Sequence, residues 1–114
     1  MTSDALAVVE RYFACMRAGD IGVVELFHDD ARLIGLGTIV EGRAAIAEFY
    51  AASIEASRPQ PRRLSEPLVA GGSVAVEISI DFSVPDMAPM HVLDLFVVDE
   101  GRIRSLTYFV SEHP

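Results

Sequence analysis

A single acidic side chain, Asp94, stands in the middle of a strongly apolar segment, MHVLDLFVV, at residues 90–98. The segment has the composition of a β-strand, and both faces of that strand are largely apolar. Asp94 is therefore expected to be buried, which is costly for an unpaired carboxylate. Two solutions are open: the acid stays protonated, or it pairs with an arginine such as Arg32 or Arg104.

Two tyrosines are also expected to be largely buried, because each lies on the apolar side of a predicted helix. Tyr12 has Val8 and Met16 one turn away on either side, and Tyr50 lies on the inner side of a helix at residues 41–56. From the residues alone, each is interpreted as a core tyrosine whose hydroxyl finds one partner.

The other reactive groups of the chain do not form a recognisable site. The HDD triplet at residues 28–30 has no further metal ligands at a usual spacing, and is predicted to be a polar turn. His91 lies three residues before Asp94 on one strand, and therefore on the opposite face. Cys15 is predicted to be a small core residue, since no histidine is spaced to activate its thiol. The sequence thus predicts no metal and no cofactor.

Composition limits the class of protein and its partners. The chain has 114 residues, of which 51% are hydrophobic, and residues 1–114 are predicted to form one globular domain. The formal net charge of −8 argues against nucleic acid and membrane surfaces as partners, because both select clustered basic side chains. The single cysteine excludes an internal disulfide, and the first residues lack the basic start of a signal peptide. We expect a cytoplasmic protein.

The order of the predicted elements indicates an α+β fold. Apolar residues recur at helical spacing in the first half of the chain, whereas later segments alternate with a period of two. Helices are predicted at residues 3–18, 21–27 and 41–56, and strands at residues 32–37, 38–40, 62–69, 74–84, 90–98 and 102–110. The helices must cover one face of a meandering antiparallel sheet, and a strongly bent sheet would leave a pocket between the layers.

Three short motifs, ERYF with Tyr12, EFYA with Tyr50 and VLDLF with Asp94, occur in an order and spacing that resemble the ketosteroid isomerases. These enzymes belong to a wider group of small cone-shaped domains typified by nuclear transport factor 2 and the SnoaL-like cyclases. The resemblance covers nearly the whole chain. It implies three helices on a strongly curved, mainly antiparallel sheet, a deep apolar pocket, no cofactor, and a homodimer formed through the outer face of the sheet.

The resemblance also implies roles for individual residues. Tyr12 and Asp94 would form an oxyanion hole that donates hydrogen bonds to a ligand oxygen, with Asp94 protonated, and Tyr50 would orient Tyr12. The ligand would be a small apolar molecule that bears a carbonyl or phenol oxygen. The expected pocket lining consists of Gly35, Phe82, Phe96, Tyr108 and Val110.

One departure from the isomerase pattern leaves the activity open. The general base of that family would stand at Gly35, and Glu41 is the nearest acid that could replace it. A positioned base is worth about 10²–10⁴-fold in rate. Three functions are therefore considered: isomerase-like proton transfer without the usual base, non-catalytic binding of an apolar metabolite, and another reaction such as SnoaL-like cyclisation. Epoxide hydrolysis would need an Asp–Arg–Asp arrangement in the pocket, where only Asp94 is expected.

Overall fold

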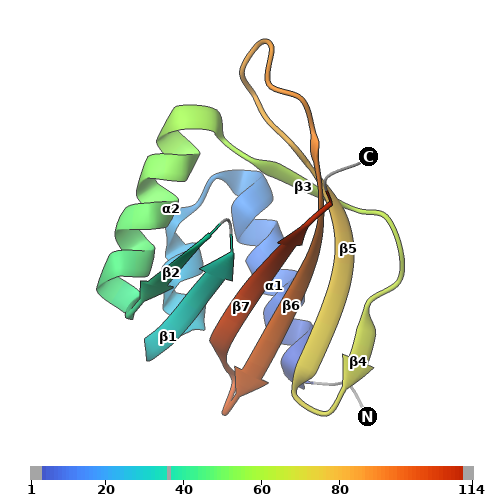
Figure 1. The fold of residues 1–114 in the computed structure, drawn as a ribbon. Coiled ribbons are helices and arrows are strands. Elements are labelled where there is room, and N and C mark those ends of the chain that lie inside the picture. Colours follow the sequence, from blue (N-terminus) through green and yellow to red (C-terminus); the bar gives the residue numbers. More distant parts are fainter. Residues whose placement is uncertain (1–3, 36, 112–114) are drawn as a thin grey trace.

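The computed structural model describes residues 4–35 and 37–111, and it contains a layer of helices on one face of a curved, unclosed sheet (Figure 1). The predicted α+β class, with three helices and a mainly antiparallel sheet, is confirmed. In chain order the elements are α1 (Asp4–Ala18), the 3₁₀ helix η1 (Ile21–Leu26), β1 (Phe27–Gly35), β2 (Thr38–Glu41), α2 (Arg43–Ser57), β3 (Gln60–Arg63), β4 (Leu68–Ala70), β5 (Ser73–Asp81), β6 (Met90–Asp99) and β7 (Arg102–Val110).

Helix α1 forms because its apolar residues recur at the helical period. The side chains that it buries lie on one stripe: Ala5, Val8, Val9, Tyr12, Phe13 and Met16. The helix ends at Gly19, whose φ of +66° is a left-handed conformation that favours glycine. Asp20 then accepts a hydrogen bond from the backbone N–H of Gly22 at 2.8 Å and so caps η1. This sharp turn brings η1 back alongside α1, and Tyr12 is fixed on the face that meets the sheet.

The strands form one sheet in the order β2–β1–β7–β6–β5–β3, with β4 also paired to β5. The pair β1–β7 is parallel and the other pairs are antiparallel. In Figure 1, β1 and β2 form one side of the sheet with α2 beside them, β6 and β7 form its middle, and α1 lies behind it. Strand β6 is therefore central, and a side chain on its helix-facing side is covered from every direction.

The pairing of β6 with β7 contains an extra residue that changes which side chains face each other. Near the hairpin turn Val98 pairs with Ile103, but Val97 pairs with Ser105, so that Arg104 is an unpaired insertion in β7. Beyond this bulge the register is displaced by one residue. Asp94 therefore lies opposite Tyr108 instead of Thr107.

Three predicted element boundaries were wrong. Residues 28–31, predicted as a turn, belong to β1, where the pairing with β7 is irregular between Phe27 and Arg32. The predicted strand at residues 62–69 is two short strands, because Pro67 lies in the stretch between β3 and β4. Strand β5 ends at Asp81, so the predicted continuation to residue 84 is loop.

The face of the sheet turned away from the helices carries exposed apolar side chains. Leu93 and Phe109 are cross-strand neighbours and are 41% and 52% exposed, and Leu68 on β4 is 74% exposed. Across the described residues, none of the helices combines the length and the apolar character needed to cross a membrane.

Candidate functional site: a cavity closed by one acid and three tyrosines

A cavity of about 130 Å³ lies between the two long helices and the inner face of β5, β6 and β7. Its wall is almost entirely apolar, and Asp94 is the only acidic side chain among the described residues that line it. The lining residues are Tyr12, Phe13, Met16, Phe49, Tyr50, Ser53, Pro59, Pro61, Ile78, Ile80, Phe82, Met90, Val92, Asp94, Tyr108 and Val110. A concave apolar site with few polar groups is the usual form of a small-molecule pocket.

Asp94 lies at the centre of the sheet, between Val76 of β5 and Tyr108 of β7. Its side chain is 1% exposed, and its Oδ1 atom is buried without a hydrogen-bond partner. Burial raises the pKa of this carboxyl from its usual 3.8 to about 8. A raised pKa favours the protonated form of Asp94 at neutral pH, and the donor role that the resemblance implied stays a prediction.

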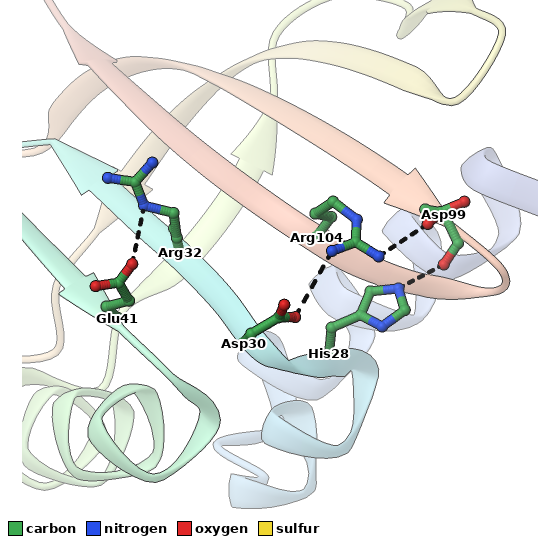
Figure 2. A network of polar contacts seen from close by, with 6 residues as sticks. All are labelled: His28, Asp30, Arg32, Glu41, Asp99 and Arg104. Atoms are coloured by element: carbon green, nitrogen blue, oxygen red, sulfur yellow. Dashed lines mark hydrogen bonds and ion pairs between the residues drawn. The ribbon is translucent and has the colours of Figure 1, made fainter.

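The two arginines considered as partners for Asp94 lie elsewhere. Arg32 pairs with Glu41 at 3.5 Å, and Arg104 pairs with Asp99 at 2.9 Å and with Asp30 (Figure 2). Figure 2 also shows His28 contacting the backbone oxygen of Asp99, so these polar groups tie β1 to the β6–β7 hairpin. The alternative of an arginine-paired Asp94 was therefore wrong for both residues.

Three tyrosine hydroxyls form a hydrogen-bonded chain beside the cavity. The Tyr50 hydroxyl lies 2.9 Å from that of Tyr12 and 2.8 Å from that of Tyr108. Burial raises the pKa of all three phenols well above 10, so each remains a neutral donor. Two of the three hydroxyl protons serve these two hydrogen bonds, and the third is either shared in the weaker contact between Tyr12 and Tyr108 or available to a ligand oxygen.

The contact of Tyr50 with Tyr12 agrees with the orienting role that the resemblance gave it. The part of Tyr108 in the chain was missed, because it had been predicted only as pocket lining. Tyr108 lies opposite Asp94 because of the bulge at Arg104, which the sequence does not reveal.

The other predicted lining residues divide into two groups. Phe82 and Val110 line the cavity with Tyr108, as expected. Phe96 does not line it: the side chain is fully buried in the core, with its ring centroid 5.1 Å from that of Tyr12. Gly35 is also absent from the lining.

Neither position considered for a general base reaches the cavity. A Cβ atom on Gly35 would lie 2.9 Å from the Cβ of Tyr108 and 3.0 Å from its carbonyl oxygen, so the place of a side chain is already filled. The Glu41 side chain is 70% exposed and pairs with Arg32. Within the described part of the chain, no group of three or more His, Cys, Asp and Glu residues is arranged to hold a metal ion.

Gly35→Ala should lower the free energy of unfolding by about 1–3 kcal/mol, measured by chemical denaturation. Gly35 has a φ of +152°, and the added methyl group would push against Tyr108. Gly37→Ala is the matched control, since Gly37 also has a positive φ, +77°, but a Cβ there meets no atom within 4 Å. Equal losses in both variants would contradict a close contact at Gly35.

The chain is similar to several known proteins. The family model described as the SnoaL-like domain matches residues 9–106. A proposed polyketide cyclase from Sinorhizobium meliloti is 25% identical with a TM-score of 0.81, over 90% of this chain and 94% of that one. SalBIII, an epoxide hydrolase/cyclase-like enzyme in pyran ring formation of the polyether salinomycin, is 25% identical with a TM-score of 0.83, over 95% and 91%. An epoxide hydrolase from M. tuberculosis, 18% identical over 95% and 83% with a TM-score of 0.84, shares the fold.

Proposed function

The chain belongs to the SnoaL-like domain family, and from that premise we propose that it catalyses proton transfer beside the carbonyl or phenol oxygen of a small apolar molecule. Ring closure and double-bond isomerisation both have such a step. The proposal depends on one observation: the Asp94 carboxyl is buried and unpartnered in an apolar cavity, next to a chain of neutral tyrosine donors.

Asp94 would carry the proton, because no other carboxyl of the residues that the structure describes lies in the cavity wall. As a carboxylate it would remove a proton from the carbon next to the substrate carbonyl, and an enolate would form. The free hydroxyl proton of the tyrosine chain would stabilise the enolate oxygen. The protonated Asp94 would then return the proton to another substrate atom, either a carbon in isomerisation or the new alkoxide oxygen in ring closure. A pKa near the working pH suits both halves of this cycle.

This assignment differs from the oxyanion-hole role that the isomerase resemblance gave Asp94. A donor pair of Tyr12 and Asp94 would leave the cavity without a base, since neither Gly35 nor Glu41 lines it. Epoxide hydrolysis is less well supported, because the wall offers no arginine and no second carboxyl. The names of two relatives, a proposed polyketide cyclase and a cyclase-like enzyme of pyran ring formation, favour ring closure among the proton-transfer reactions.

A second candidate is a binding protein without chemistry for an apolar metabolite. The glycine at position 35 favours it, because the base position of the isomerases is filled there by Tyr108. Such a protein would use the same neutral donors to hold a ligand oxygen.

The proposal is tested with 3-cyclohexenone, a one-ring β,γ-unsaturated ketone whose conversion to the conjugated isomer is followed in the ultraviolet. We expect turnover whose kcat/KM rises with pH and levels off above about 8, as Asp94 ionises. Asp94→Asn should lower the rate by about 10²–10⁴-fold, because the amide cannot accept the proton. Asp30→Asn, at an exposed acid outside the cavity, should leave the rate unchanged.

Binding of a nitrophenol, titrated in parallel, separates the two candidate functions. Binding to the folded wild type without any turnover would favour the binding protein. A kcat/KM that falls above pH 8 would contradict Asp94 as the base and support its role as a protonated donor. No binding and no turnover would contradict both functions.

We propose that two copies associate through the outer sheet face around Leu93 and Phe109, which is where the family resemblance places a homodimer. Exposed apolar residues on neighbouring strands make a surface that a second copy could cover. Phe109→Asp should convert a dimer into a 12.4 kDa monomer in sedimentation velocity. Met87→Asp, in the exposed β5–β6 loop, is the control and should not change the mass. A monomeric wild type at about 100 μM would contradict the proposal.

A further inference from the structure

The size of the cavity sets a limit on the ligand. At about 130 Å³ it is close to the roughly 150 Å³ of an engineered protein cavity that holds one benzene molecule. Pockets for drug-sized ligands span about 300–1,000 Å³. A single six-membered ring fills a space of this volume, whereas a fused ring system would have to extend beyond it.

The Tyr108 side chain has a close contact at each of its two ends. At its outer end the hydroxyl is held 2.8 Å from that of Tyr50. At its inner end the backbone of Gly35 lies against it, since a Cβ atom on Gly35 would be 2.9 Å from the Tyr108 Cβ and 3.2 Å from its ring. The side chain is held at both ends, so its ring cannot move aside for a larger ligand without losing one of these contacts.

Most polar groups of the cavity lie together, and Ser53 of α2 is the further polar side chain among the lining residues. Tyr108 and Asp94 are directly opposed on neighbouring strands, and the tyrosine chain continues from Tyr108 to the helices. The remaining wall is formed by apolar side chains such as Met16, Ile78 and Val92. A ligand with one oxygen can place it at the polar side while its ring contacts only apolar atoms. A second polar group on the ring would need a partner elsewhere in the wall, such as the Ser53 hydroxyl.

We propose that Tyr108, seated on Gly35, is the specificity-determining residue of this site and restricts its substrates to compounds of about the size of one six-membered ring. The inference rests on the proposed function and adds to it a substrate class and the residue that selects it. The glycine that replaces the usual base is then explained by the space that Tyr108 requires.

Three phenols of increasing ring number test this inference: phenol, 2-naphthol and a four-ring phenolic steroid, each titrated into the wild type and two variants. Larger apolar ligands normally bind more tightly, because they bury more surface. The wild type should show the reverse order, with 2-naphthol at least about 10-fold weaker than phenol and no binding of the steroid. Tyr108→Ala should reverse this order, whereas Tyr108→Phe should keep it, because the ring remains.

Phe109→Ala is the matched control. Phe109 is the next residue of β7, and its aromatic side chain lies on the opposite face of the sheet. This variant should keep the wild-type order of affinities for the three phenols. Tyr108→Leu, which leaves a smaller void, replaces Tyr108→Ala if that variant does not show a cooperative thermal transition. Wild-type affinity that grows with ring number would overturn the inference and leave the proposed function standing. An unchanged order in folded Tyr108→Ala or Tyr108→Leu would also overturn the inference alone, and binding of none of the phenols to the wild type would overturn both.

Discussion

Asp94→Asn should gain stability relative to the wild type as the pH rises. The difference in free energy of unfolding, variant minus wild type, should be larger at pH 9 than at pH 3 by roughly 5 kcal/mol. The carboxyl has a pKa of about 8 in the folded protein, against the usual 3.8 in the unfolded chain. Between these values the unfolded state has released the proton while the folded state still holds it. The wild type therefore loses stability as the pH rises from about 4 to about 8, by about 1.4 kcal/mol per pH unit. Asparagine has nearly the same size and cannot ionise.

Urea denaturation of both proteins at a series of pH values from 3 to 9 measures the effect. The difference between the variant and the wild type removes the contribution of the other ionisable groups, which both proteins share. The difference should be constant below pH 4, grow between pH 4 and pH 8, and be constant again above pH 8. Asp30→Asn is the control and should show no such growth, because the Asp30 side chain is 79% exposed. A difference that does not change with pH would mean that Asp94 is not buried as an acid.

Much of the fold could be predicted because local patterns and the tertiary structure agree. The stripe of apolar residues in α1 is long and regular, and Gly19 marks its end. The alternation in β5 and β6 gives the faces that are buried, and the apolar neighbourhood of Asp94 already implied an unusual acid. These features depend on spacing within one segment, which a sequence shows directly.

Contacts between segments could not be predicted in the same way. The partner of Asp94 on β7 depends on the unpaired Arg104, and a single inserted residue in a strand leaves little trace in its composition. The turn predicted at residues 28–31 is instead held in β1, where Arg43 pairs with Asp29 and Arg104 with Asp30. The approach of Gly35 to Tyr108 likewise depends on the parallel pairing of β1 with β7, which are far apart in the sequence.

The tyrosine chain should stabilise the protein through Tyr50 more than through either end. Tyr50 contacts both of the other hydroxyls, so Tyr50→Phe would remove two hydrogen bonds and leave Tyr12 and Tyr108 without these partners. A hydrogen bond contributes about 0.5–1.5 kcal/mol, and a buried group left without a partner costs about 1–3 kcal/mol. We expect Tyr50→Phe to lower the free energy of unfolding by about 2–4 kcal/mol, although the ring itself is kept.

Tyr12→Phe and Tyr108→Phe provide the comparison, because each removes one hydrogen bond of the chain. Each should cost about 1 kcal/mol, and in each case Tyr50 keeps its other partner. Urea denaturation at pH 6, where Asp94 is protonated in the fold, keeps the charge in the cavity the same for all four proteins. Equal losses in the three variants would contradict the central place of Tyr50.

A double variant, Tyr12→Phe with Tyr108→Phe, tests the central place of Tyr50 a second time. It removes the same two hydrogen bonds as Tyr50→Phe but leaves only the Tyr50 hydroxyl unpartnered within the chain. Tyr50→Phe leaves two hydroxyls without this partner, whereas the double variant leaves one. The double variant should therefore lose less stability, since each buried hydroxyl without a partner adds a cost beyond the lost hydrogen bond.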